Sequence, residues 1–244
     1  MGDRPPGLLG VLGGMGPLAT VDFLRKLLEE TPAERDADHV PVVVYSVPQI
    51  PDRPAAILGE GPSPVPAMAA GIRVLTRAGA TRIAIACNTA HYWFEELARE
   101  AGVPLLHIAE AACDELAQRG VSATAVGVIG TRGTITAGFY QERLAARGIR
   151  ALLSSEVDLT EFVLPAIAAV KRGDLPRAHE LAVRACEQLR AAGAQSIILA
   201  CTELPPALDL HPTEVATICV DATRALARAC VRWWLESSGA DRRP

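Results

Sequence analysis

The chain has 244 residues, half of them hydrophobic and 21% charged, and its formal net charge is −4. This length fits one large domain or two small ones and is enough to bury a sizeable core. Aromatic residues make up only 4% and no basic cluster stands out, which argues against a nucleic-acid-binding surface. The start "MGDRPPG" is unlike a secretory signal, and no uncharged apolar run reaches the roughly 18–20 residues that span a bilayer. We therefore expect a cytoplasmic protein that binds neither nucleic acid nor membrane.

Apolar strands and amphipathic helices alternate along the first half of the chain. The predicted order is strand 7–13, helix 17–30, strand 40–46, helix 64–80, strand 82–87, helix 91–102, strand 103–108 and helix 109–120. Such alternation, with strands that are apolar throughout, predicts a parallel sheet covered by helices on both faces. Ligands of such sheets bind beyond the carboxyl ends of the strands.

The second half of the chain repeats the first. "GVLGGMGPLATVDFLRKL" aligns with "GVIGTRGTITAGFYQERL" at an offset of 117 (from Gly10 to Gly127), and "LTRAGATRIAIAC" aligns with "LRAAGAQSIILAC" at an offset of 114 (from Cys87 to Cys201). We therefore predict an α/β fold of two pseudo-symmetric domains, each a short, mainly parallel sheet flanked by helices, with the active site in the cleft between them. The predicted domains are 1–107 plus 221–244, with the C-terminal helix returning to the first half, and 108–220.

The six cysteines are spread along the chain without a CxxC motif or a His/Cys cluster, so neither a zinc site nor a disulfide framework is predicted. Four of them lie inside predicted helices or a short strand and are expected to be structural: Cys113, Cys186, Cys219 and Cys230. The other two, Cys87 and Cys201, end the matching strands "RIAIAC" and "SIILAC". If both sheets face one cleft, these two cysteines approach it from opposite sides.

A pair of opposed cysteines suits proton transfer to and from a carbon. Each follows a strand and precedes an expected helix start, where the helix dipole favours a thiolate. A thiolate on one face of a carbon and a thiol on the other can remove and return a proton, which inverts the centre. Two core cysteines inherited by duplication, or a redox dithiol, are the alternatives. His91, four residues after Cys87, either tunes that thiol or packs in the first turn of its helix, whereas His107 is expected to be structural.

Six motifs together carry a resemblance to a known family. "GGMGPLAT", "PQIPDR", "ACNTAH", "GTRGTITAGFYQ", "VKRGD" and "ACTELP" occur in order between about residues 8 and 210. This set resembles the aspartate/glutamate racemase family, and within it the aspartate racemase branch. The resemblance implies two α/β domains, a homodimer, catalysis without pyridoxal phosphate (PLP), and Cys87 and Cys201 as the two catalytic bases.

The same resemblance implies the other site residues. Arg53 would bind a substrate carboxylate, with Lys171 nearby. Pro54 stands where the family often has Thr or Ser beside the arginine. The residues implied to hold the α-carboxylate and ammonium are Asn88, Thr89, Thr202 and Glu203. The residues implied to form the other loops around the cleft are Met15, Gly16, Gln49 and Thr131.

Lysine usage bears on the cofactor. Of the 24 lysines and arginines only Lys26 and Lys171 are lysines. We expect Lys26 to be a solvated residue on a helix face, and Lys171 either to suit the helix dipole or to bind a carboxylate. A PLP enzyme needs a Schiff-base lysine, and neither lysine lies in a recognisable phosphate-binding motif. "GMGPLA" fits a dinucleotide-binding pattern only weakly because the second strand has no acidic residue, so we predict no cofactor and no metal.

The sequence therefore predicts a PLP-independent racemase of a small amino acid, with L- and D-aspartate as the substrates. Glutamate or broad-specificity racemisation, or isomerisation of a small dicarboxylate by cysteine chemistry, are the enzymatic alternatives. A two-lobed binding module for a small anion is the non-enzymatic one.

Overall fold

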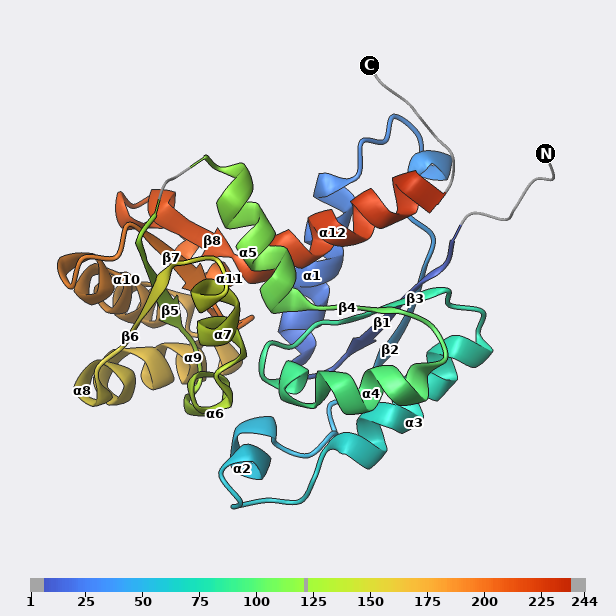
Figure 1. Ribbon diagram of the computed structural model, residues 1–244, viewed down its shortest axis with the longest axis horizontal. Coiled ribbons are helices and arrows are strands. Elements are labelled where there is room, and N and C mark those ends of the chain that lie inside the picture. Colours follow the sequence, from blue (N-terminus) through green and yellow to red (C-terminus); the bar gives the residue numbers. More distant parts are fainter. Residues whose placement is uncertain (1–6, 121–122, 238–244) are drawn as a thin grey trace.

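A computed structural model describes residues 7–120 and 123–237, and it contains two parallel four-stranded sheets (Figure 1). The first sheet has the order β2-β1-β3-β4, and the second has the corresponding order β6-β5-β7-β8. The strands of the first sheet are β1 (Leu9–Gly13), β2 (Val42–Ser46), β3 (Arg82–Ile85) and β4 (Leu105–Leu106). Those of the second are β5 (Ala125–Ile129), β6 (Arg150–Leu153), β7 (Ser196–Leu199) and β8 (Cys219–Asp221). The predicted pair of similar α/β units is therefore confirmed.

The register of the central strands repeats as well. Gly10 of β1 lies opposite Ile83 of β3, and Gly127 of β5 lies opposite Ile197 of β7. A side chain on Gly10 would collide with Ile83, because an added Cβ would lie 2.7 Å from the isoleucine methyl. Close packing at this position thus explains one glycine of the sequence repeat.

Helices cover the two sheets. In the first half they are α1 (Pro17–Glu30), α2 (Arg53–Ile57), α3 (Val65–Arg77), α4 (Phe94–Ala101) and α5 (Ile108–Gln118). In the second half they are α6 (Arg132–Ala137), α7 (Phe139–Ala145), α8 (Glu156–Asp158), α9 (Leu164–Lys171), α10 (Leu175–Ala191), α11 (Leu204–Leu208) and α12 (Ala222–Ser237). A π-helical turn at Leu159–Val163 joins α8 to α9, and 3₁₀ turns occur at Asp36–Asp38, Thr89–Trp93 and Val215–Ile218. Within the described residues, no helix is both long and apolar enough to cross a membrane.

The first helix shows how the sequence sets the fold. Pro17 occupies its first turn, where the missing N–H costs no intrahelical hydrogen bond. Ala19, Phe23 and Leu27 recur at a spacing of four residues and are buried, as expected for one face of a helix packed on a sheet. The predicted helix 17–30 has the bounds of α1, whereas the predicted helix 91–102 is a 3₁₀ turn followed by α4.

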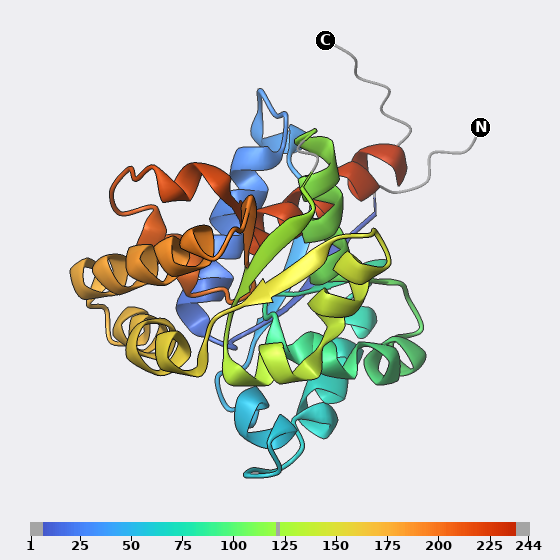
Figure 2. The same ribbon diagram turned by 60° about the vertical axis from the view of Figure 1, so that its left-hand side comes forward.

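The hydrophobic core runs through both halves. One apolar cluster includes Leu9 and Val11 of β1 as well as Val126 and Val128 of β5. Figure 1 shows α1, α5 and α12 between the two sheets, where α12 packs against both α1 and α5. In the turned view of Figure 2, α12 still crosses behind α5. The division into 1–107 plus 221–244 and 108–220 stays a prediction, and the packing of α12 on α1 is in keeping with it.

Lys26 corrects one expectation. Its side chain is fully buried rather than solvated, and it forms ion pairs with Asp22 of α1 and, at 2.6 Å, with Asp221 at the end of β8. A buried ammonium is stable only when paired, and two carboxylates surround this one. Lys26 is thus a structural link between the first half and the end of the second sheet.

Candidate active site

Cys87 and Cys201 follow equivalent strands and meet at one cavity. Each lies two residues after the end of its strand, Cys87 after β3 and Cys201 after β7, and each of these strands lies inside its sheet. Both side chains are buried, and both line a cavity of about 30 Å³, which we call the cysteine cavity. The two halves of the chain thus contribute one thiol each to the same small space.

Residues from four more chain segments complete the cysteine cavity. Its lining consists of Met15, Asp52, Arg53, Pro54, Cys87, Asn88, Thr89, Thr131, Lys171, Cys201, Thr202 and Glu203. Two of the residues implied by the resemblance lie elsewhere. Gly16 lines the adjoining cavity, and Gln49 is exposed in the turn after β2, between Pro48 and Ile50, which do line that cavity.

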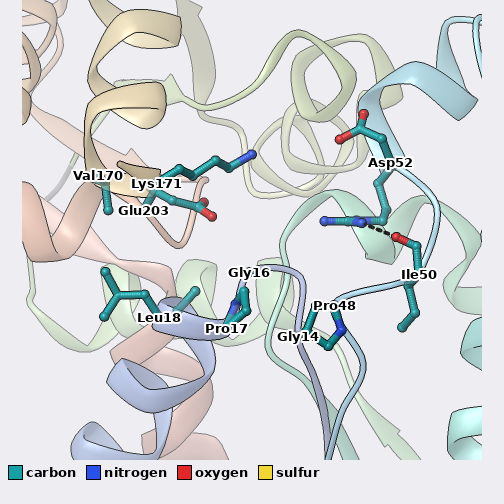
Figure 3. Close-up of a pocket in the computed structure, with 12 residues that line it drawn as sticks. Gly14, Gly16, Pro17, Leu18, Pro48, Ile50, Asp52, Val170, Lys171 and Glu203 are labelled. Carbon is teal, nitrogen blue, oxygen red and sulfur yellow. Dashed lines mark hydrogen bonds between the residues drawn. The ribbon is translucent and has the colours of Figure 1, made fainter. Parts of the chain in front are cut away.

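The adjoining cavity has a volume of about 640 Å³, and we call it the outer chamber. It shares Asp52, Arg53, Lys171 and Glu203 with the cysteine cavity. Figure 3 shows Lys171 and Glu203 reaching into the open space from one side, with Asp52 on the opposite side and Gly16 and Pro17 at the start of α1 between them. The outer chamber is therefore continuous with the surroundings of the two thiols through a set of four charged residues.

Arg53 gives Cys87 a cationic neighbour. Burial raises the pKa of the Cys87 thiol, and the Arg53 guanidinium opposes that shift by charge attraction and by a hydrogen bond. Arg53 is the first residue of α2. Its Nη1 donates to the carbonyl oxygens of Ile50 and Pro51, both at 3.0 Å, and Figure 3 shows the bond to Ile50 as a dashed line. Its buried Nε has no hydrogen-bond partner among the described residues, so this N–H can be donated to a ligand.

Glu203 gives Cys201 an anionic neighbour. The Cys201 Sγ–H donates to Glu203 Oε2 at 3.0 Å, and Thr202 Oγ1 donates to the same oxygen at 3.2 Å. Burial first, and then the Glu203 carboxylate, raise the pKa of Cys201 well above its usual range, whereas Lys171 lowers it. Cys201 is accordingly a thiol.

The expectation that both positions favour a thiolate is therefore wrong, because the pKa of each cysteine is raised. A 3₁₀ turn that runs directly into α4 follows Cys87, and the five-residue helix α11 follows Cys201. Burial is the largest cause of both pKa shifts, so the desolvation of a buried thiolate outweighs the favourable partial charge of these helix starts.

Hydroxyl groups tie the two halves together at the rim of the cysteine cavity. Thr89 Oγ1 lies 3.1 Å from Thr131 Oγ1 and 2.7 Å from Thr134 Oγ1, and the latter two are 3.0 Å apart. Thr89 comes from the first half, whereas Thr131 is the N-cap of α6 in the second half. Sequence reasoning did not find Thr134, whose role depends on contacts across the two halves.

Tyr140 holds the amide of Asn88. Its hydroxyl donates to Asn88 Oδ1 at 2.6 Å, and its side chain is fully buried. Asn88 Nδ2 is buried with no hydrogen-bond partner in the described part of the chain, and Asn88 lines the cysteine cavity. Sequence reasoning missed this role of Tyr140, although a signal was present: the repeat aligns Tyr140 with Phe23, and the added hydroxyl is the group that binds Asn88.

His91 supports the backbone of Cys87. Its Nδ1–H donates to the carbonyl oxygen of Cys87 at 2.8 Å, and burial lowers the pKa of His91 to about 4, so the ring is neutral. The neighbouring His107 accepts from the Ala109 N–H at 3.1 Å at the start of α5, and burial lowers its pKa to about 2. His91 thus touches the main chain of Cys87 rather than its thiol, and His107 is a helix cap.

Sequence comparison assigns the chain to a family. The profile of the Asp/Glu/Hydantoin racemase family matches residues 12–230. The chain belongs to that family. Its relatives include the broad specificity amino-acid racemase RacX of Bacillus subtilis (strain 168), which is 30% identical over 234 residues, covering 93% of this chain and 98% of RacX. Family membership makes the protein a racemase, a class of isomerase.

Solved structures of racemases share the fold. An aspartate racemase from Picrophilus torridus has a TM-score of 0.80 and 33% identity, covering 96% of this chain and 94% of its own. A glutamate racemase from Francisella tularensis, in complex with D-glutamate, has a TM-score of 0.68 at 16% identity over 98% of this chain and 85% of its own. The second likeness concerns the fold alone.

Proposed function

We propose that this racemase interconverts L- and D-aspartate by PLP-independent proton transfer at Cα, with Cys87 and Cys201 as the two bases. The observation that carries the proposal is that both thiols, one from each half of the chain, line one cavity together with two cationic side chains. We further expect a homodimer in the cytoplasm, without nucleic acid or membrane as a partner.

The mechanism needs one thiolate and one thiol. A thiolate takes the proton from Cα, and the thiol on the opposite face then gives its proton to the resulting carbanion, so the two cysteines exchange protonation states in each turnover. Arg53 favours the thiolate at Cys87, and Glu203 favours the thiol at Cys201. The charge distribution therefore supports Cys87 as the base and Cys201 as the acid for one enantiomer, with the roles reversed for the other.

The charged residues suit the groups of aspartate. Arg53 can bind a carboxylate through parallel hydrogen bonds, and the Lys171 ammonium is the second cation at the cavity. Glu203 can accept from the substrate ammonium, and the free Asn88 amide can donate to a carboxylate. Cations fixed beside Cα would also stabilise the negative charge that develops when its proton leaves.

Ion pairs exclude one of the two lysines as a Schiff base. Lys26 is buried in ion pairs with Asp22 and Asp221, so it is not available to form a Schiff base. The other lysine, Lys171, lies at the end of α9 beside Cys201.

In the described residues, no group of three or more His, Cys, Asp and Glu side chains is arranged to hold a metal ion.

Replacement of either thiol tests the proposal. We expect Cys87→Ala and Cys201→Ala each to lower the rate of aspartate racemisation by more than about 10³-fold, because each removes one of two obligatory proton carriers. Each Cys→Ser variant is expected to keep exchange of Cα–H from one enantiomer only. The measurement is loss of optical rotation together with deuterium uptake at Cα in heavy water, without added cofactor.

Cys113→Ala is the matched control, because Cys113 is a buried cysteine of α5 outside both cavities. It should keep the wild-type rate. Wild-type racemisation by either Ala variant of the pair would overturn the two-base mechanism. Aspartate binding without any Cα exchange would instead favour the binding module, and exchange with glutamate but not aspartate would favour a glutamate racemase.

A further inference from the structure

We propose that the same site also racemises amino acids with long, apolar side chains, of the methionine and leucine class, and that the outer chamber receives those side chains. The inference rests on the proposed function, because it uses the same two thiols for the proton transfer. It adds a second substrate class to aspartate and assigns a role to a cavity that aspartate does not fill.

The charged residues lie only where the two cavities meet. The four charged residues of the outer chamber are the same four that also line the cysteine cavity. We call this set, Asp52, Arg53, Lys171 and Glu203, the charged seam. The remaining lining of the outer chamber is uncharged throughout: Gly14, Gly16, Pro17, Leu18, Ala19, Pro48, Ile50 and Val170.

This arrangement separates substrates by the length of their side chains. The reacting Cα must lie at the two thiols, so the α-carboxylate and ammonium are held at the charged seam. A side chain as short as that of aspartate ends at the same seam. A longer side chain would pass it and enter the chamber. There Leu18 and Val170 lie on one side and Pro48 and Ile50 on the other, as Figure 3 shows.

The size of the chamber also exceeds what aspartate needs. An apolar cavity of about 150 Å³ is sufficient for benzene, a molecule of six heavy atoms. The outer chamber has about 640 Å³, within the range in which ligand pockets bury larger molecules. The side chain of aspartate, with its single methylene, would leave most of this volume to water.

Charge balance points to neutral amino acids as well. The charged seam contains two cations, Arg53 and Lys171, and two carboxylates, Asp52 and Glu203, so its formal charges cancel. A zwitterionic amino acid with an apolar side chain adds no net charge to this set, so the charged seam suits neutral amino acids as well as aspartate. An apolar side chain in the chamber would moreover cover Leu18, a large hydrophobic residue that is 49% exposed, and the removal of apolar surface from water favours binding.

The first test compares aspartate with two longer amino acids of similar length, one apolar and one polar. L-aspartate, L-methionine and L-glutamine are incubated separately with the protein in heavy water without added cofactor, and deuterium at Cα is followed. We expect exchange with methionine, with kcat/KM about tenfold above that for glutamine, since an amide gains nothing from an apolar wall. Exchange with aspartate but not with methionine would overturn this inference and leave the proposed function intact. Exchange with neither would overturn both.

The second test fills the chamber. We expect Leu18→Trp to lower kcat/KM for methionine at least about tenfold more than for aspartate, because the indole occupies space that only the longer side chain needs. Val21→Trp is the matched control: Val21 lies three residues later on α1, is 62% exposed, and lines neither the outer chamber nor the cysteine cavity. It should change neither value by more than about twofold. Equal losses for both substrates in Leu18→Trp would show that methionine does not use the chamber.

Discussion

Cys87 and Cys201 border one cavity but have oppositely charged neighbours. The Arg53 guanidinium lowers the pKa of Cys87 against the effect of burial, whereas the Glu203 carboxylate raises that of Cys201 further. Negative charge is therefore more stable on Cys87. At the scale of single residues, the site is asymmetric even though the strands that carry the cysteines are equivalent.

Tyr140 is expected to position Asn88. Removal of the hydroxyl in Tyr140→Phe would leave the buried Asn88 Oδ1 without its donor and free the amide to turn. An unsatisfied buried group of this kind costs about 1–3 kcal/mol, so we expect kcat/KM for the substrate to fall about tenfold, mainly through KM. Steady-state kinetics of racemisation measures the split between kcat and KM.

A double-mutant cycle separates positioning from a general structural effect. In an Asn88→Ala background, Tyr140→Phe should change kcat/KM by less than about twofold, because the group that it orients is already absent. A full tenfold loss in both backgrounds would contradict the role assigned to Tyr140.

At the scale of elements, ion pairs hold the C-terminal helix onto the first half. Arg224 and Arg228 of α12 each pair with Glu30 of α1 at 2.7 Å. Lys26 of α1 pairs with Asp221, which also accepts from the N–H groups of Thr223 and Arg224 at the start of α12. These contacts join the last turns of α1 to the first turns of α12.

The only two lysines of the chain give a pair of opposite predictions. Lys26→Met leaves two carboxylates near each other without their buried counter-ion, and the loss of one partner from a buried pair destabilises by about 3–5 kcal/mol. Lys171→Met removes an exposed ammonium, so we expect the free energy of unfolding to change by less than about 0.5 kcal/mol while racemisation falls. Urea denaturation and activity assays distinguish the two effects. Equal stability of Lys26→Met and the wild type would contradict the structural role.

Short-range patterns in the sequence predicted the elements and the pair of cysteines. Parallel strands present their carboxyl ends at one edge, so a residue just after a strand such as β3 or β7 lies where ligands bind. Long-range contacts were not predictable in this way. The burial of Lys26 depends on Asp221, which is almost 200 residues away along the chain. Gln49 shows a similar limit, because a turn decides which of three consecutive residues faces the outer chamber, and here its neighbours do so.

At the scale of the whole molecule, a core shared by both halves contributes a pH-dependent stability. His91 and His107 lie next to each other, with ring centroids 4.9 Å apart, where the two halves pack together. The pKa of His91 is lowered from 6.5 to about 4 by burial, so the unfolded chain binds a proton between these pH values that the folded chain does not. The contribution of this group to stability is therefore fully present above about pH 6.5. As the pH falls from 6.5 to about 4, the free energy of unfolding decreases by about 3 kcal/mol.

The variant His91→Asn should show a smaller loss of stability over this pH range than the wild type, whatever its stability at neutral pH. Urea denaturation at several pH values between 4 and 7 gives the two slopes. His211→Asn, which removes an exposed imidazole, is expected to keep the wild-type slope. Identical slopes for all three proteins would show that acid acts through other groups.

Thermodynamics limits how far the unequal charges around the two thiols can change the kinetics of the two enantiomers. Mirror-image amino acids have the same free energy in water, so the equilibrium constant between them is one. It follows that kcat/KM must be equal in the two directions, whatever Arg53 and Glu203 do to the pKa values of Cys87 and Cys201. Their asymmetry can change kcat and KM only in proportion: the enantiomer with the lower KM must also be the one with the lower kcat.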